Sequence, residues 1–235
     1  MQVRAALFDV FGTVVDWRGS LIAEFTAWGA RNGFADADWT GLVDAWRGAY
    51  APSMDRVRRG ELPWTPLDAL QRATLDDLAP RFGLAGLDPA GRDWVNGGWE
   101  RLQPWPDSAP GLLRLKRRCI VGTLSNGNLA LLLRMGRAAG LPWEFIGSAE
   151  LFRHYKPDAE TYLGACELLR LPPEEVKLCA AHNSDLAAAR RRGLRTAFIP
   201  RPTEYGPEQA RDLGPEGDWD IVAADIEELA ARLGG

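Results

Sequence analysis

The sequence VRAALFDVFGTVVD, residues 3–16, joins a short apolar run to an acid and a turn. Residues 3–9 are mostly apolar and end at Asp9, and Gly12 and Thr13 follow in a turn-prone position. An apolar run of this length next to a turn signal predicts a buried strand followed by a loop. The sequence therefore places a carboxylate at the end of the first strand.

The rest of the chain changes character twice. From about residue 21 to residue 99, amphipathic stretches broken by Gly and Pro predict helices, and Pro104 and Pro106 then mark a stiff connection. Beyond them, strand-like and helix-like segments alternate, which indicates parallel βαβ units. We expect an α/β fold, with a Rossmann-like parallel sheet in a core domain of residues 1–16 and 104–235 and a helical domain of residues 17–103 inserted after the first strand.

Composition excludes several kinds of partner. The 235 residues carry a formal net charge of only −4, so nothing in the sequence predicts a basic surface for nucleic acid or a membrane. No apolar stretch reaches the roughly 20 residues of a membrane-spanning helix. Three widely spaced cysteines form no CxxC pair, and the N-terminal run lacks the features of a signal peptide. We expect a cytoplasmic protein with a small-molecule partner.

The polar residues that follow the predicted strands are the candidates for chemistry, because ligands of an open parallel sheet bind beyond the carboxyl ends of its strands. These residues are Asp9, Ser125, Asn126, Lys156, His182, Asn183 and Asp185.

A carboxylate at a strand end can be partly desolvated and aimed at one electrophilic atom, so Asp9 is the candidate nucleophile. A second carboxylate nearby, Asp185, would raise its pKa, and Lys156 is the cation that could keep Asp9 ionised. Ser125 and Asn126 could hydrogen-bond a substrate, cap the following helix, or do both.

The order of these residues is similar to the four motifs of the haloacid dehalogenase superfamily. The segment FDVFGTVVD, residues 8–16, resembles the nucleophile motif of that superfamily, and LSNGN, YKPD and the downstream Asp185 resemble the other three. The resemblance covers nearly the whole chain. It implies that the helical insert is the cap domain of such a protein.

Two features distinguish the branches of the superfamily. Phosphatases carry a second Asp two residues after the nucleophile, where this chain has Phe11, and an acid near the start of the fourth motif, where it has Ala180 and Ala181. The shell of oxygen ligands that Mg²⁺ requires is therefore incomplete, and we expect neither a metal nor another cofactor. Within the metal-independent branch, the chain resembles L-2-haloacid dehalogenases.

That resemblance implies SN2 attack of Asp9 on a short 2-haloalkanoic acid, followed by hydrolysis of the aspartyl ester to a 2-hydroxy acid. Arg47 and Asn126 would receive the halide. The substrate and halide site would also include Phe11, Thr13, Ser125 and Tyr162. Arg47 could instead be an exposed arginine, and Tyr162 a core residue.

The fourth motif departs from the family pattern, because His182 stands at the position where relatives have an Asn. We expect Asp185 to orient Lys156 or the hydrolytic water, with His182 or Asn183 assisting, although His182 could be structural. A small-molecule phosphatase and a non-catalytic binding protein on the same fold are the competing interpretations. A homodimer is a further implication of the resemblance.

Overall fold

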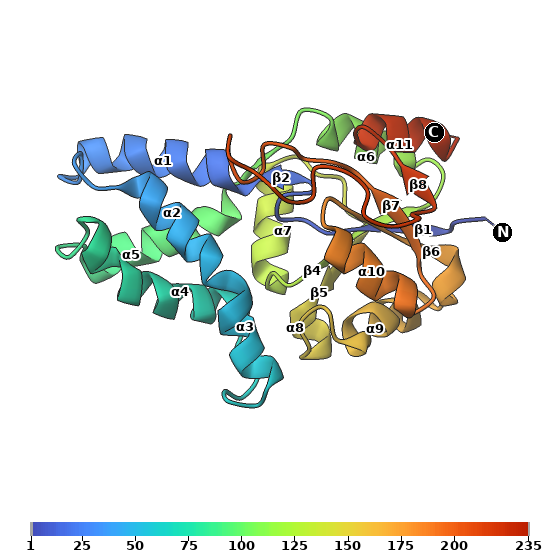
Figure 1. Cartoon of the computed structure of the whole chain (residues 1–235), viewed down its shortest axis with the longest axis horizontal. Coiled ribbons are helices and arrows are strands. Elements are labelled where there is room, and N and C mark those ends of the chain that lie inside the picture. Colours follow the sequence, from blue (N-terminus) through green and yellow to red (C-terminus); the bar gives the residue numbers. More distant parts are fainter. Residues whose placement is uncertain (1, 235) are drawn as a thin grey trace. The chain divides into compact units, whose positions relative to one another are not determined.

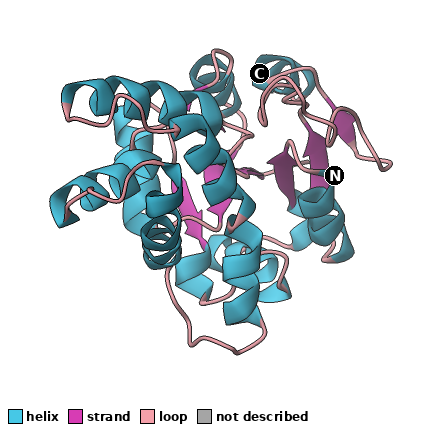
Figure 2. Ribbon diagram, turned by 60° about the vertical axis from the view of Figure 1, so that its left-hand side comes forward, coloured by secondary structure: helices cyan, strands magenta, loops and turns pink. Residues whose placement is uncertain are grey.

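The computed structural model describes residues 2–234, and the chain divides into two compact units. One unit consists of Met1–Asp16 together with Gln103–Gly235, and the other is Trp17–Leu102. Figure 2 distinguishes the helices from the strands, and every described strand belongs to the first unit, which we call the sheet unit. The second is called the helical unit.

The sheet unit contains a six-stranded sheet in the order β5-β4-β1-β6-β7-β8, in which every neighbouring pair is parallel. This sheet confirms the predicted α/β fold. Its strands are β1 (Ala5–Phe8), β4 (Ile120–Ser125), β5 (Phe145–Ser148), β6 (Val176–Ala180), β7 (Arg195–Phe198) and β8 (Ile221–Val222).

The register explains why the polar residues gather at one edge. Phe8, the last residue of β1, lies opposite Thr123 of β4 and Cys179 of β6, so all three strands end near the same level. From β1 the chain passes to β4 and β5 on one side, and from β5 it crosses to β6 on the other side of β1, so the strand order reverses at β1. Ligands of doubly wound sheets bind at such a point.

Helices cover both faces of this sheet, and in Figure 1 α6 and α11 lie on one side of it and α9 and α10 on the other. On the second side, Leu7, Leu124 and Leu178 of three adjacent strands share one apolar cluster with residues of α9 and α10. The helices of the unit are α6 (Ser108–Leu115), α7 (Leu129–Ala138), α8 (Ala149–Phe152), α9 (Ala159–Leu169), α10 (Asn183–Arg191) and α11 (Ile226–Arg232), with a 3₁₀ turn at Pro173–Glu175.

A two-stranded antiparallel ribbon lies where the chain leaves and re-enters the sheet unit. It pairs β2 (Val15–Asp16) with β3 (Gln103–Pro104). Strands of two residues are too short to produce a recognisable alternation of apolar and polar positions, and the sequence did not indicate them.

The helical unit is packed around tryptophan rings. Trp17, Trp46 and Trp99 are nearly fully buried, and the ring of Trp46 meets that of Trp99 edge to face, with centroids 5.4 Å apart. Such rings bury large apolar areas, so their role in this unit is packing. The unit consists of α1 (Trp17–Arg31), α2 (Trp39–Gly48), α3 (Tyr50–Arg58), α4 (Leu67–Leu78) and α5 (Pro89–Asn96), with 3₁₀ turns at Ala79–Phe82 and Gly97–Glu100.

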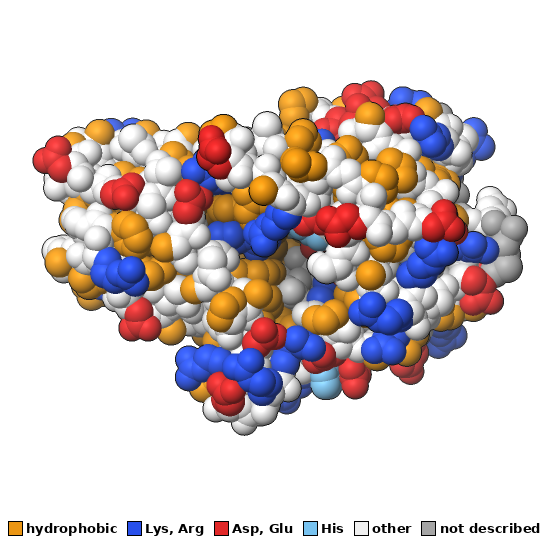
Figure 3. All heavy atoms as spheres, in the orientation of Figure 1, with side chains coloured by type: hydrophobic (Ala, Val, Ile, Leu, Met, Phe, Trp, Pro, Cys, Tyr) orange, Lys and Arg blue, Asp and Glu red, His pale blue; other side chains and the backbone are white. Residues whose placement is uncertain are grey.

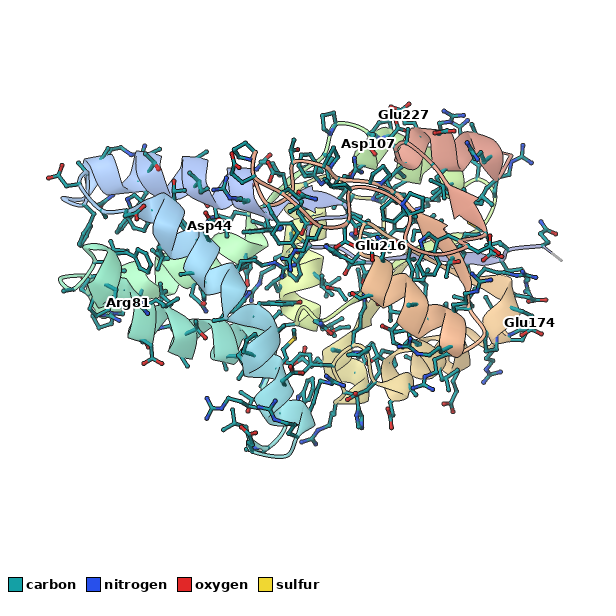
Figure 4. The ribbon with its side chains drawn as sticks, viewed as in Figure 1. Asp44, Arg81, Asp107, Glu174, Glu216 and Glu227 are labelled. Atoms are coloured by element: carbon teal, nitrogen blue, oxygen red, sulfur yellow. The ribbon has the colours of Figure 1, made fainter. Side chains whose placement is uncertain are left out.

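Charged side chains of both signs are interspersed over the face shown in Figure 3. Many of them are paired, as Asp44 is with Arg18, whose guanidinium donates to both carboxylate oxygens (Figure 4). Among residues 2–234, no helix has the length and apolar character needed to cross a membrane.

Candidate active site

The ammonium group of Lys156 lies between two carboxylates beyond the carboxyl ends of the strands. Its Nζ lies 3.2 Å from Oδ1 of Asp9, which follows β1, and 2.6 Å from Oδ2 of Asp185, in the first turn of α10. The side chains of Asp9, Lys156 and Asp185 are 14%, 7% and 10% exposed, so the three charges are largely shielded from water. The structure thus brings together three residues that the sequence predicted as one group.

Lys156 favours the ionised form of Asp9. Burial alone would raise the pKa of Asp9, but the Lys156 ammonium and hydrogen bonds from His182 and Thr13 outweigh it and hold the pKa below its usual value. Burial opposes the charge of Lys156 as well, and the two carboxylates nevertheless raise the pKa of its ammonium. Asp9 is therefore an anion and Lys156 a cation at neutral pH.

The two oxygens of Asp9 have different environments. Oδ2 accepts hydrogen bonds from Thr13 Oγ1 at 2.9 Å and faces Nδ1 of His182 at 3.0 Å, whereas Oδ1 meets Lys156. Each carboxylate oxygen has two lone pairs. Within residues 2–234, Oδ2 has both lone pairs engaged and Oδ1 has one available for attack.

Thr13 connects the loop after β1 to the end of β6. Its hydroxyl donates to Asp9 and accepts from the backbone N–H of Ala181 at 2.9 Å. Phe11 is nearly fully buried, and its ring packs against the backbone of Gly127, in the loop after β4. The loop that carries Asp9 is thereby fixed on two sides.

Ser125 is the last residue of β4 and Asn126 follows it, close to where the sequence placed them. The Ser125 hydroxyl oxygen accepts from the N–H of Gly127 at 3.1 Å, and the Asn126 Oδ1 accepts from the backbone N–H of Lys156 at 2.9 Å. Because its oxygen is held by the lysine backbone, Asn126 can offer the donors on Nδ2 to an anionic ligand.

Tyr162 lies on α9 and donates to Oδ1 of Asp185 at 2.6 Å. It is fully buried, and burial together with the Asp185 charge raises the pKa of its phenol, so it acts as a donor at neutral pH. The ring is a core residue whose hydroxyl orients Asp185.

His182 stands between two carboxylates, one of which the sequence did not reveal. Its Nδ1 faces Asp9, and its Nε2 lies 2.9 Å from Oε2 of Glu204, a side chain that is only 1% exposed. Burial would lower the pKa of His182, but Glu204 and Asp9 together raise it well above its ordinary value. His182 therefore belongs to the site, and the carboxylate oxygen that faces each of its ring nitrogens favours the imidazolium.

Glu204 comes from the irregular segment after β7, where no periodic pattern marks any residue. The one available signal was its place soon after the predicted strand TAFIP, residues 196–200, because neighbouring strands end at the site. Gly12 provides room for it. Position 12 has φ +91°, and a Cβ there would collide with the Glu204 carboxylate, so the glycine is required on both grounds.

Asn183 is placed differently from the expectation. Its side-chain amide does not meet Asp9, Lys156 or Asp185, and it binds instead the chain around residues 212–219. Adjacent residues at the start of α10 point in different directions, so the His182 side chain faces Asp9 while that of Asn183 faces residues 212–219.

Arg47 lies on α2 in the helical unit. Its guanidinium carbon is 4.3 Å from the ring centroid of Tyr50 and 5.2 Å from that of Trp17, which is a cation–π arrangement on two sides. Such stacking orients the flat guanidinium group.

Within the described residues, no group of three His, Cys, Asp or Glu side chains is arranged to hold a metal ion. The cation that Asp9 and Asp185 share is the Lys156 ammonium. Ala180 and Ala181, at the end of β6, add no oxygen ligand from their side chains.

The doubly wound sheet and its lysine-bridged carboxylates define the class as an α/β enzyme with its site at the switch point of the sheet. A family model described as haloacid dehalogenase-like hydrolase matches residues 3–176, and the chain belongs to that family. This membership confirms the resemblance seen in the sequence.

Individual relatives agree with the family. The chain is 30% identical over 244 residues to (S)-2-haloacid dehalogenase 4A of Burkholderia cepacia, covering 97% of this chain and 99% of that protein. It is 54% identical to an L-2-haloacid dehalogenase of known structure, with a TM-score of 0.96 and 99% of each chain covered. A defluorinating L-2-haloacid dehalogenase is 46% identical, with a TM-score of 0.95 and coverage of 99% of this chain and 96% of the other.

Proposed function

We propose that the protein is an (S)-2-haloacid dehalogenase, which removes halide from short 2-haloalkanoic acids and gives 2-hydroxy acids. The observation that carries the proposal is the buried Asp9 carboxylate held by Lys156 at 3.2 Å. The high identity to named dehalogenases over nearly the whole chain supports it.

In the first step, Asp9 Oδ1 attacks the α-carbon of the substrate. The new O–C bond forms as the C–halogen bond breaks, and the halide leaves with the bonding electron pair, which inverts the α-carbon. Lys156 keeps the attacking Asp9 carboxylate ionised. Partial burial of that carboxylate removes much of the water that would weaken it as a nucleophile. The product of this step is a neutral aspartyl ester.

In the second step, water attacks the carboxyl carbon of Asp9, and the acyl C–O bond breaks to release the hydroxy acid. Esterification removes the Asp9 charge, which is one cause of the raised pKa of His182. The pKa of His182 falls and the imidazolium releases one proton to solvent, which is the proton that the overall reaction liberates. The neutral ring can then take a proton from the attacking water. Glu204 stabilises the imidazolium that forms, and its proton then passes to the departing alkoxide. The ring finally takes the proton of the new Asp9 carboxyl group, which restores the Asp9 carboxylate and the imidazolium.

The remaining predicted residues receive binding or positioning roles in this proposal. Asn126, through Nδ2, and Arg47 would stabilise the departing halide, and Ser125 would donate to the substrate carboxylate. Phe11 would provide an apolar wall. Asp185 would hold Lys156 in place.

The resemblance to the superfamily implies three further proposals. The helical unit would be the cap domain, the protein would form a homodimer, and it would act in the cytoplasm. The last agrees with three cysteines that are free thiols, as expected in a reducing compartment.

Halide release tests the proposal most simply. Fluoro-, chloro- and bromoacetate and both enantiomers of 2-chloropropionate would be assayed with and without a chelator, beside an aryl phosphate. We expect halide release that a chelator does not reduce, a preference for the S enantiomer, and no turnover by Asp9→Asn. Magnesium-dependent phosphate release that exceeds halide release would instead support the phosphatase interpretation.

A further inference from the structure

The segment between β7 and β8, residues 199–220, contains no helix or strand, and we call it the β7–β8 loop. Unstructured connections longer than about 12–15 residues are uncommon in compact domains and are often functional. This loop carries Glu204, the buried partner of His182.

The first half of the loop is held by Arg201. Its guanidinium forms two hydrogen bonds of 2.7 Å with the Asp107 carboxylate, at the start of α6 (Figure 4), and its Nε donates to the carbonyl oxygen of Thr13. The backbone N–H of Glu204 donates to the carbonyl oxygen of Arg201 at 3.1 Å. The backbone of Glu204 therefore belongs to a turn that Arg201 holds in place.

The second half of the loop is held by Asn183, the residue directly after His182. Its Nδ2 donates to Asp212 Oδ1 and to the Gly214 carbonyl oxygen, both at 3.0 Å. Its Oδ1 accepts from the backbone N–H of Glu216, labelled in Figure 4, and from Trp219 Nε1, both at 2.9 Å. Two donors and two lone pairs are the full capacity of an amide, and all four are used on this loop.

Gln209 connects the two halves. Its Oε1 accepts from the N–H of Tyr205, and its Nε2 donates to the carbonyl oxygens of Arg201 and Arg211. The guanidinium of Arg211 lies 3.8 Å from the ring centroid of Tyr205. Asn183 binds Asp212, whose chain neighbour Arg211 accepts from Gln209. Gln209 in turn binds Tyr205, the residue directly after Glu204.

From these contacts we infer that Asn183 is a positioning residue for the hydrolytic half-reaction, which acts by anchoring the β7–β8 loop so that Glu204 stays on His182. This inference rests on the proposed function, because it concerns the second step of that reaction. Formation of the ester needs Asp9 and Lys156 but not Glu204, so Asn183 affects the two steps unequally.

A double-mutant cycle tests the inference. Wild type, Asn183→Ala, Glu204→Gln and the double variant react with L-2-chloropropionate in single turnovers, with halide release and the mass of the ester followed separately. Rates are normalised to the amplitude of the halide burst. We expect Asn183→Ala to slow ester hydrolysis on the order of tenfold, because small displacements of catalytic groups are costly. The rate constant of the halide burst should stay within about twofold of wild type.

In the Glu204→Gln background, adding Asn183→Ala should change hydrolysis by no more than about twofold, because both changes act through the same carboxylate. Glu208→Gln, an exposed position of the same loop, is the matched control and should leave both steps unchanged. Gln209→Ala repeats the test without altering α10, should Asn183→Ala fold poorly, and should also slow hydrolysis alone.

Equal slowing of both steps, or a full additional effect in the Glu204→Gln background, would overturn the inference. So would unchanged hydrolysis in Asn183→Ala or, where that variant folds poorly, in Gln209→Ala. A wild-type protein that releases no halide would contradict the proposed function instead, so the two failures are distinguishable.

Discussion

Replacing Glu204 with Gln should separate the two chemical steps. The change keeps the shape of the side chain and removes the negative charge 2.9 Å from Nε2 of His182. At an effective dielectric constant of about 20, two unit charges at that distance interact by roughly 6 kcal/mol. If about half of a charge has developed on the ring in the transition state, the loss is about 3 kcal/mol, or roughly 100-fold in the rate of hydrolysis.

The assay is a rapid-quench experiment with L-2-chloropropionate. Glu204→Gln should release about one equivalent of chloride per site in a burst, and the protein should then carry the mass of the ester. Steady-state turnover should fall with the hydrolysis step, while Glu208→Gln behaves as wild type. Wild-type hydrolysis in Glu204→Gln, or loss of its chloride burst, would refute the assignment of Glu204 to the second step.

Three further variants test other parts of the site. Lys156→Met leaves buried carboxylates without their cation, so we expect about 3–5 kcal/mol lower stability in denaturant and a slower halide burst, since the pKa of Asp9 rises. Because the pKa of His182 is higher in the folded than in the unfolded chain, protonation of His182 stabilises the fold. This contribution is fully present below about pH 6.5 and is lost as pH rises through the folded-state pKa. The free energy of unfolding of wild type should therefore exceed that of His182→Gln by less at pH 9 than at pH 6. A difference that stays constant over this range would contradict the prediction. Arg47→Lys loses the flat guanidinium group stacked on Tyr50, and we expect the halide burst to slow on the order of tenfold. A burst at the wild-type rate would contradict the proposed role of Arg47 in halide binding.

Much of the sheet unit was predictable because its signals are local. The apolar run before Asp9 and the later alternation of strands and helices indicate a parallel sheet, and the structure contains it. The carboxyl ends of parallel strands meet at one edge of the sheet, which is why the sequence alone groups Asp9, Lys156 and Asp185. The β2–β3 ribbon could not be predicted, because two-residue strands leave no pattern.

The rest of the site depends on tertiary structure. Glu204 reaches His182 from a loop with no periodicity, and only the fold shows that Gly12 leaves space for it. The sequence also does not show which way the Asn183 side chain points, because spacing along a chain does not tell which of two adjacent polar residues faces Asp9. Its partners lie about 30 residues further along the sequence.

The most direct measurement is a single turnover in ¹⁸O-water with enzyme in excess over L-2-chloropropionate. Because water is proposed to attack the carboxyl carbon of Asp9, the isotope should enter that carboxylate, and the first lactate formed should carry unlabelled oxygen. Mass spectrometry of the peptide containing Asp9 reads the label. Isotope found in the first lactate, with none in Asp9, would show that water attacks the substrate directly and would contradict covalent catalysis.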